Sequence, residues 1–386
     1  MFKFKPEQII TKMPEHFNDI RPYNSVEAKE ALKRLQKSDV FFSVLKYLFP
    51  EENRAIHEKI MTEVNSIRDF QVKIMAKVVS RISTSTMTNF SFSGLENLKK
   101  GESYLFISNH RDIFLDSALL QLLLVENGFD TTEITFGNNL MKDPLIVEVG
   151  KINKMFKVYR HGKPKELLEK TSQLSEYIRY AINVKNESVW IAQRGGRTKD
   201  GNDTTQASVI KMFNSSGKKT FEENIRELKV VPLSISYEYE PCDEYKVKEL
   251  FDSIDGTYKK AEKEDFNCII EGVKKNKGNV HISIGKVIDE ELDVLKNVKR
   301  INEKASYLSS LIDKHVYKTY KLWPGNYIAL DILNSNYNYK KYYTEEQKTY
   351  FETYINNQLE KIPGYTNGHK ELLLKIYAQP VINSEK

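Results

Sequence analysis

The pattern that most constrains the fold of this chain is an alternation of strand-like and helix-like runs between residues 86 and 290. Helix-like runs at 113–125, which is mostly apolar, and at 165–183 are predicted to be helices, and short apolar or β-branched runs around them are predicted to be strands. The predicted strands are 89–93, 104–108, 133–136, 157–159, 188–192, 229–237 and 280–284. Strands and helices that alternate in this way favour an α/β domain, so we expect a mixed central sheet flanked by helices.

Helical patterns precede this domain. Ser25 is expected to cap a helix over 26–36, and a longer helical pattern extends from 51 to about 80. Between them lies an aromatic-rich run at 40–49. Its apolar side chains either anchor the protein at a membrane interface or pack an N-terminal helical layer onto the main domain, and the sequence leaves both interpretations open.

Helical patterns also follow the domain. A periodic run spans 303–321, and Thr344 and Gln347 form a capping box for a helix that reaches about residue 361. A chain of 386 residues is long enough for one large domain with appendages. The sequence therefore predicts three parts, which are an N-terminal helical segment (1–85), an α/β domain (86–290) and a C-terminal helical extension (291–386).

The composition limits the classes of partner. Lys and Arg number 59 against 53 Asp and Glu, and this excess of 6 is too small to indicate nucleic-acid binding. It is compatible with weak attraction to an anionic membrane surface or to an acidic carrier protein. The two cysteines, Cys242 and Cys268, have neither metal-site nor disulfide-framework spacing, which favours a reducing cytoplasm. Residues 1–6 lack an apolar signal core, and no apolar run of about 18 residues predicts a spanning helix.

Residues 104–118 carry the strongest indication of chemistry. The apolar run ends in Ser-Asn-His, so His110 is predicted at the carboxyl end of a strand, where ligands of α/β sheets gather. Imidazole titrates nearest neutral pH, and an adjacent carboxylate orients it and stabilises its protonated form. Asp112 and Asp116 are the available carboxylates, and Asp112 has an alternative role as the cap of the next helix. A surface histidine in an ordinary strand–turn–helix unit is the alternative interpretation of the whole segment.

This segment resembles the Asn-His-x4-Asp block of the glycerolipid acyltransferases. In that family the histidine is the general base and the aspartate orients it. The family spacing would place the aspartate at position 115, which is Leu115 here. A one-residue adjustment of the loop before the helix would bring Asp116 into that place. The resemblance therefore implies His110 as the base and Asp116 as its partner, with Asp112 as the alternative.

Two later segments resemble the blocks that bind the acceptor in that family. In the first, Asn138 lies in a Gly-Asn-Asn turn, and a following strand closes on Arg160. The family's arginine at this place binds the acceptor phosphate, and a guanidinium group offers a rigid fork of donors that matches phosphate oxygens. A solvated basic residue after a strand is the alternative interpretation of Arg160.

The second segment runs from a buried strand into a glycine-rich, basic turn at 194–201. It resembles the family's Pro-Glu-Gly-Thr-Arg block, and its glycines would let backbone N–H groups approach an anion. The Pro and Glu are absent, and Gly195 stands where the Glu would fall, so Asp200 or Asp203 is considered as a replacement. The residues expected to bind phosphate or to form the substrate loop are Arg194, Gly195, Gly196, Arg197 and Lys199. An ordinary basic loop is the alternative.

A strand with Val-Pro at 231–232 resembles the fourth block, so four segments follow one another in the family's order between 104 and 236. The resemblance covers about 86–290 and implies a fold similar to that of glycerol-3-phosphate acyltransferase. The patterns of other enzyme classes are missing, since the chain has no Gly-x-Ser-x-Gly elbow, no P-loop and no zinc-like histidine spacing.

The resemblance implies an O-acyltransferase of phospholipid biosynthesis. Such an enzyme would move a fatty acyl group from acyl-CoA or acyl carrier protein to the hydroxyl of lysophosphatidic acid or glycerol 3-phosphate, without a cofactor or a metal. It would be cytoplasmic and peripheral at the inner face of the cytoplasmic membrane, where it would meet a lysophospholipid. The departures from the family pattern leave two alternatives, which are a non-phosphate lyso-lipid acceptor, such as an amino-acid lipid, and a non-catalytic lipid-binding scaffold. Nothing in the sequence indicates an oligomeric state.

Overall fold

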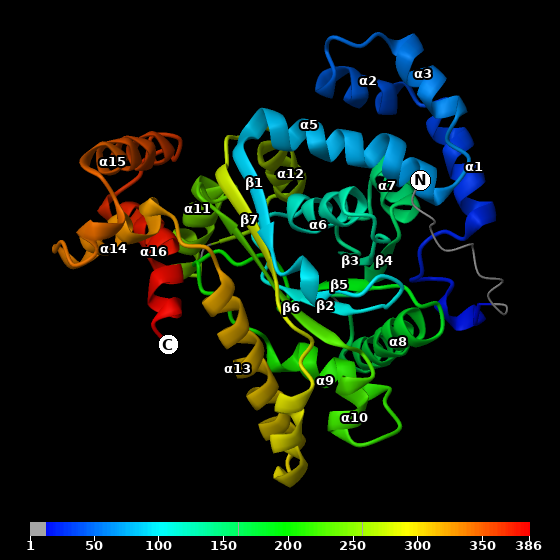
Figure 1. Cartoon of the computed structure of the whole chain (residues 1–386). Coiled ribbons are helices and arrows are strands. Elements are labelled where there is room, and N and C mark those ends of the chain that lie inside the picture. The colour runs from blue at the N-terminus through cyan, green and yellow to red at the C-terminus, as the bar shows by residue number, and fades with distance from the viewer. Residues whose placement is uncertain (1–12, 161, 257) are drawn as a thin grey trace.

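A seven-stranded sheet with helices on both faces forms the centre of the computed structural model, which describes residues 13–160, 162–256 and 258–386 (Figure 1). The strands are β1 (Met87–Ser93), β2 (Leu105–Ser108), β3 (Glu133–Gly137), β4 (Met155–Val158), β5 (Val189–Ala192), β6 (Val230–Tyr237) and β7 (Gly278–Ile284). Each overlaps one of the runs predicted to be a strand. The prediction of a mixed sheet flanked by helices is therefore confirmed.

The direction of the strands decides where a site can form. The sheet order is β1-β7-β6-β2-β5-β3-β4, and the five strands from β6 to β4 run parallel to one another. β7 is antiparallel to β6, and β1 is parallel to β7. The carboxyl ends of the five parallel strands therefore meet at one edge of the sheet, where ligands of α/β folds bind.

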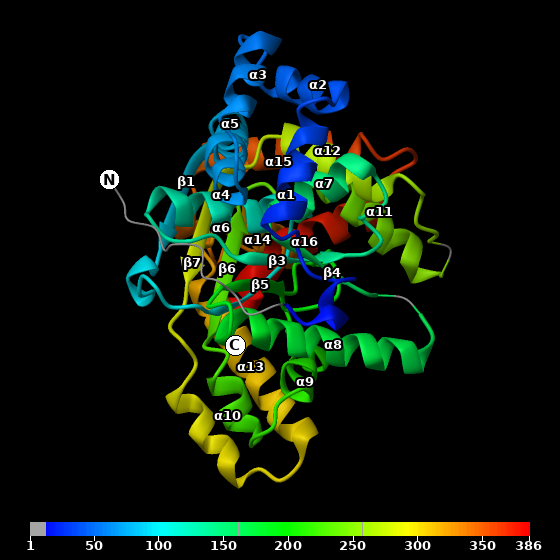
Figure 2. The same cartoon turned by 90° about the vertical axis from the view of Figure 1, so that its right-hand side faces the viewer.

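The two faces of the sheet are covered by different helices, as the two views show (Figures 1 and 2). On one face lie α5 (Ala76–Thr86), α6 (Leu115–Glu126), α7 (Pro144–Ile152) and α12 (Glu264–Lys274). On the other face lie α8 (Pro164–Asn183), α9 (Ala207–Ser215), α10 (Phe221–Arg226) and α13 (Ile301–Thr319), with the 3-10 helix η4 (Glu290–Asn297). β2 is buried on both sides, because Phe106 belongs to the first core and Leu105 and Ile107 to the second.

The N-terminal helices extend the first of these layers. They are α1 (Ser25–Leu35), α2 (Asp39–Leu48), α3 (Arg54–Thr62) and α4 (Ile67–Asp69), with the π-helix η2 (Phe70–Met75). The short helix η1 (Glu15–Phe17) packs on the other face, because Phe17 is buried in the second core. In the aromatic run, Phe41, Phe42, Leu45 and Phe49 are buried in the first core. Val40, Val44 and Tyr47 lie on the opposite face of α2 and are exposed. The packing interpretation therefore holds for one face of α2, and its other face stays available for contact.

Two local predictions in this region are wrong. The cap of α1 is Asn24 rather than Ser25, because the Asn24 side chain accepts from the amides of Val26 and Glu27, and the Glu27 carboxylate accepts from the Asn24 amide. The pattern at 51–80 is not one helix, since Ser66 caps a new one by accepting from Asp69. Residues 1–6, which lack a signal core, lie outside the described residues.

The C-terminal helices form a cluster beside the sheet, at the left in Figure 1. They are α14 (Pro324–Asn334), α15 (Glu345–Leu359) and α16 (Asn367–Ser384), joined by the 3-10 helix η5 (Lys340–Tyr342), and they share a third core with α11 (Asp243–Ile254). The predicted capping box at Thr344 and Gln347 opens α15. The remaining short helix, η3 (Leu95–Asn97), follows β1. The division of the chain at residues 85 and 290 stays a prediction.

Candidate active site

The residue after the end of β2, Asn109, ties the site to the sheet. Its side-chain Oδ1 accepts from the amide of Ile235 at 2.8 Å, and its Nδ2 donates to the Ile235 carbonyl at 3.0 Å. These bonds continue the β2–β6 pairing beyond the last residue of the strand. His110 therefore leaves the sheet edge at a fixed point, and its carbonyl accepts from the amide of Thr198 at 2.7 Å.

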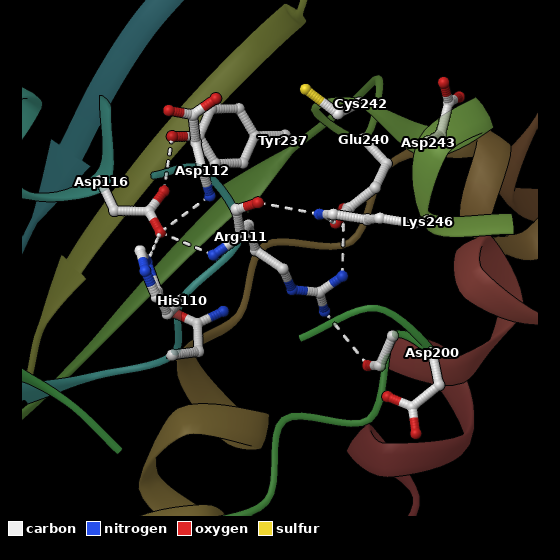
Figure 3. A network of polar contacts seen from close by, with 12 residues as sticks. His110, Arg111, Asp112, Asp116, Asp200, Tyr237, Glu240, Cys242, Asp243 and Lys246 are labelled. Atoms are coloured by element: carbon white, nitrogen blue, oxygen red, sulfur yellow. Dashed lines mark hydrogen bonds and ion pairs between the residues drawn. The ribbon is translucent and has the colours of Figure 1, made fainter. Parts of the chain in front are cut away.

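His110 and Asp116 form a direct pair (Figure 3). Asp116 lies in the first turn of α6, and its Oδ2 is 2.8 Å from Nδ1 of His110. The same oxygen accepts from the amides of Arg111 at 2.6 Å and Asp112 at 3.0 Å, and Oδ1 accepts from the Tyr237 hydroxyl at 2.7 Å. An ionised carboxylate only accepts hydrogen bonds, so Nδ1 of His110 carries the proton and Nε2 keeps its lone pair. Trp190 packs edge-on against the imidazole, with ring centroids 5.6 Å apart.

Asp112 has a different environment. It is buried, and its Oδ1 accepts from the amides of Phe114 and Leu115, each at 2.8 Å. These bonds satisfy amides at the beginning of α6, which starts at Leu115 rather than at Ile113. Burial and the nearby negative charge of Asp116 raise the pKa of the Asp112 carboxyl. The geometry thus separates the two aspartates, since one contacts the imidazole and the other supports the helix.

Arg111 joins a buried ionic network that connects residues 109–112 with two later segments of the chain (Figure 3). Its guanidinium donates to Asp203, with a shortest distance of 2.6 Å, and to Glu240 at 3.0 Å. Lys246 donates to the other Glu240 oxygen at 2.5 Å and to the carbonyl of Arg111 at 2.8 Å. Burial alone would lower the pKa of Arg111, but the carboxylates of Asp203 and Glu240 outweigh it and raise the pKa well above its usual range.

A small pocket of about 80 Å³ lies in front of His110 at the edge of the sheet. Its charged lining groups are Arg160, Arg197, Lys199, Lys260, Glu249 and Asp265. The four cations exceed the two carboxylates by two charges, 4 − 2 = +2. Both lysines are engaged, Lys199 by Glu249 and Lys260 by Asp265. Neither arginine forms an ion pair among the described residues, so both guanidinium groups can bind an anion, although the side chain of Arg197 also contacts the thiol of Cys268.

Two glycines shape this pocket. Gly137 ends β3 beside Arg160, and a Cβ on it would lie 3.0 Å from the guanidinium Nε of Arg160. Gly196 has a φ of +87°, in the left-handed region that favours glycine. Lys199, which lines the same pocket, is partly buried. Burial together with the charges of Arg197 and Lys260 lowers the pKa of Lys199 to about 8.

The other residues predicted for this site lie at its periphery. Arg194 donates to the carbonyl of Asn202 at 3.3 Å, and Gly195 donates its amide to the side chain of Gln206 at 2.9 Å, and neither lines the pocket. Asn139 lines the pocket in place of Asn138, whose Oδ1 faces the Arg160 amide at 3.4 Å. The two considered replacements for the missing Glu are also absent from the lining, because Asp203 is engaged by Arg111 and Asp200 accepts from the amide of Asn202.

A larger groove of about 640 Å³ adjoins the small pocket, and its walls are almost entirely apolar. It runs between α2, η2, α5, α6, α7 and α12. The pocket and the groove share the lining residues Ile113, Ser117, Ile134 and Phe136. Binding sites for small ligands range from about 300 to 1,000 Å³, so this groove is large enough for a long apolar ligand. A ligand in it would place its end next to His110.

A comparison with protein families points to the same region of the chain. A family model described as Acyltransferase matches residues 89–236. This region is therefore similar to an acyltransferase domain. The matched region covers most of β1 and β6 and all of β2 to β5, and it contains His110, Asp116, Arg160 and the glycine-rich loop. The match supports acyl transfer as the reaction class.

Two further comparisons were made. A search of curated proteins finds no match to this chain. Among solved structures, it is similar to the crystal structure of the 1-acyl-sn-glycerophosphate (LPA) acyltransferase, PlsC, from Thermotoga maritima, with 14% sequence identity and a TM-score of 0.36. The similarity covers 76% of this chain and 94% of that chain.

Several site residues were not predicted from the sequence. Tyr237 ends a predicted strand, so its place at the carboxyl edge of the sheet was a usable signal. Trp190 lies within a predicted strand, and its position beside His110 follows only from the pairing of β5 with β2. Glu249, Lys260 and Asp265 come after the last of the four family-like blocks, which ends at 236, and no local pattern marks them.

Proposed function

We propose that this acyltransferase moves a fatty acyl group from a thioester, acyl-CoA or acyl carrier protein, to the hydroxyl of lysophosphatidic acid or glycerol 3-phosphate. One arrangement carries the proposal. The His110–Asp116 pair lies where a cationic pocket of about 80 Å³ meets an apolar groove of about 640 Å³. A phosphate-bearing acceptor requires a cationic pocket and a fatty acyl chain requires an apolar groove, and the base must lie between them.

His110 is proposed as the general base. Its Nε2 would take the hydroxyl proton of the acceptor while the hydroxyl oxygen attacks the thioester carbonyl carbon. The C–S bond would then break, and the leaving thiolate would receive the proton from the imidazolium. Between these two proton transfers, the carboxylate of Asp116, whose Oδ2 lies 2.8 Å from Nδ1 of His110, would stabilise the imidazolium. The products are an ester and a free thiol, and no acyl-enzyme intermediate is required.

The acceptor phosphate is assigned to the cationic pocket. A phosphomonoester carries a charge of about −1.5 to −2 at pH 7, and the charged lining groups sum to +2. Arg160 and Arg197 would bind its oxygens, because Lys199 and Lys260 are already paired with carboxylates. A phosphodiester headgroup carries about one negative charge and matches this pocket less well.

The negative charge that develops on the thioester oxygen needs a donor. The amides of Arg111 and Asp112 are engaged by Asp116, and those of Phe114 and Leu115 by Asp112, so these groups are not free to serve. The indole Nε1 of Trp190 is buried and has no hydrogen-bond partner among the described residues. Because Trp190 lines the pocket next to His110, we assign this N–H as a candidate donor.

Membrane contact is proposed to be peripheral. In the part of the chain that the structure describes, no helix combines the length and apolarity needed to cross a membrane. Val40 and Val44 are 64% and 46% exposed on the outer face of α2, and they also line the groove. A helix with this exposed face can lie at the membrane interface, where a lipid acyl chain would reach the groove directly.

Lipid analysis tests the proposal most broadly. Mass spectrometry of lipids from cells with and without the protein reports the acceptor and the acyl chain together. An increase in one phosphatidic acid species, lost with His110→Ala, is the expected result. An unchanged lipid profile, together with no thioester consumption by the purified protein, would leave a non-catalytic lipid-binding scaffold as the better account.

A non-phosphate lyso-lipid, such as an amino-acid lipid, is the second candidate acceptor. It is favoured by Glu249 and Asp265, which place two carboxylates in the same pocket; an amine would bind them in exchange for Lys199 and Lys260. Arg160→Ala separates the two acceptors, because Arg160 forms no ion pair among the described residues and its charge is assigned to the phosphate. A phosphate acceptor should bind at least tenfold more weakly to the variant, since a hydrogen bond to a charged group contributes about 1.5–3 kcal/mol. Activity toward an amino-acid lipid should be almost unchanged.

A further inference from the structure

We propose that the C-terminal helices hold the catalytic segment 109–112 in position, through the hydroxyl of Tyr377. This proposal rests on the assignment of His110 as the general base. It gives residues of the C-terminal extension a role in acyl transfer, although they lie outside the region that the family model matches.

Tyr377 joins the C-terminal cluster to the segment after β6. It lies on α16, is 2% exposed, and its hydroxyl accepts from the amide of Glu240 at 2.9 Å. The same hydroxyl donates to the buried carboxylate of Asp243 at 2.9 Å, which also accepts from Tyr354 of α15 at 2.6 Å. The backbone of Glu240 is therefore held by a hydroxyl whose own orientation is fixed by two partners.

Glu240 in turn holds the catalytic segment from both sides. One carboxylate oxygen accepts from the guanidinium of Arg111, and the other accepts from Lys246, which donates to the carbonyl of Arg111 (Figure 3). The Arg111 amide donates to the Asp116 oxygen that contacts His110. A continuous path of hydrogen bonds therefore runs from α16 to the His110–Asp116 pair.

A second contact joins α16 to the same network. Gly201 approaches the helix so closely that a Cβ on it would lie 2.4 Å from the carbonyl oxygen of Ile376. The Gly201 carbonyl accepts from the guanidinium of Arg111 at 3.1 Å. Arg111 thus depends on α16 through Glu240 on one side and through Gly201 on the other.

The network is closed to solvent, so water cannot replace a hydrogen-bond partner that is lost. Arg111, Lys246, Asp203 and Glu240 are each at most 5% exposed, and a buried ionic group that loses a partner must move or stay unpaired. A shift of the Arg111 backbone changes the His110–Asp116 geometry, because its amide and the imidazole share one oxygen. A misplacement of about 1 Å can cost on the order of 100-fold in rate.

The test compares Tyr377→Phe with Tyr343→Phe. Tyr343 belongs to the same core, and its hydroxyl donates to the buried Asp331 at 2.7 Å, so both variants lose a phenol–carboxylate hydrogen bond. Only Tyr377 contacts Glu240. We expect kcat to fall about tenfold in Tyr377→Phe alone, with KM for donor and acceptor within about twofold of wild type. Equal kcat in the two variants, or a change confined to KM, would overturn the proposal.

Amide hydrogen exchange gives a readout that does not depend on activity. The amides of Arg111 and Asp112 should exchange faster in Tyr377→Phe than in Tyr343→Phe, because both donate to Asp116 and the backbone that carries them is no longer held in place. Unchanged exchange would overturn the positioning role even for an inactive protein. If His110→Ala retains turnover, the proposed function fails, while this measurement still decides the coupling.

A second pair of variants covers the case in which Tyr377→Phe does not fold. Gly201→Ala would place a methyl group against the carbonyl oxygen of Ile376. Gly256 has a φ of +74°, similar to the φ of Gly201, but a methyl group in Gly256→Ala would meet nothing within 4 Å. Both carry the backbone strain of a left-handed alanine. Only the first should lower kcat and accelerate exchange at Arg111, and equal behaviour of the two would contradict the proposal.

Discussion

The replacement of Asp116 by asparagine tests the assignment of the base and its partner. An asparagine at 116 can keep the local geometry, because its carbonyl oxygen can accept from His110, Arg111 and Asp112. Its amide group would then face the Tyr237 hydroxyl, which can turn to accept. Asp116→Asn should therefore fold with His110 in place. The substitution removes only the negative charge beside the imidazole.

The size of the effect follows from the burial of the pair. The side chains of His110 and Asp116 are 10% and 0% exposed. Two unit charges about 4 Å apart interact by about 4 kcal/mol at an effective dielectric constant of about 20. About 1.4 kcal/mol corresponds to a tenfold change in rate, so the loss of imidazolium stabilisation should lower kcat roughly 1,000-fold. The measurement is release of free thiol from acyl-CoA at saturating lysophosphatidic acid.

Asp112→Asn is the matched control. Asp112 is equally buried and lies four residues away, but its Oδ1 caps the beginning of α6, a role that asparagine fills as well as aspartate. Burial and the charge of Asp116 already raise the pKa of Asp112, so asparagine removes a charge that this environment disfavours. We expect kcat within about threefold of wild type. Equal losses in the two variants, or an Asp116→Asn enzyme with more than about a tenth of wild-type kcat, would refute the assignment.

Three further predictions concern the pocket. Lys199 is charged below its pKa of about 8, so KM for a phosphate acceptor should rise as the pH passes above 8. In Lys199→Gln, the KM obtained from initial rates should not change over this pH range. Gly195→Glu should be tolerated, because only Gln206 Oε1, at 3.6 Å, would contact its Cβ, and the restored carboxylate should lower KM for a glycerol-based acceptor; an unchanged KM in a folded variant would contradict this role. Trp190→Phe should lower kcat about tenfold in the thiol-release assay with little change in either KM, whereas a loss of binding alone would assign Trp190 to packing.

The fold could be predicted from the sequence because its central strands, β2 and β6, are buried on both faces. Runs such as 104–108 and 230–235 are largely apolar, which is typical of the central strands of a parallel sheet. The position of His110 followed from the same pattern, since it stands directly after such a run. Helix boundaries were less predictable where two polar residues compete to cap, as at Asn24 and Ser25.

The periphery of the site could not be predicted in the same way. Asn138 and Asn139 are neighbours in one turn, and the direction of the backbone after β3 decides which of them lines the pocket. The partners of Arg111 lie 92 and 129 residues further along the chain, so no local spacing connects them. Such contacts depend on how the sheet brings the ends of β5 and β6 beside β2.

The most direct test of the central claim is a two-product assay on the purified protein. Acyl-CoA and lysophosphatidic acid are supplied together, and free thiol and phosphatidic acid are measured in the same sample. The account predicts acceptor-dependent release of one thiol for each ester formed, and loss of both products in His110→Ala, with the fold of the variant unchanged by circular dichroism. Thiol release without ester, or equal turnover by His110→Ala, would contradict it.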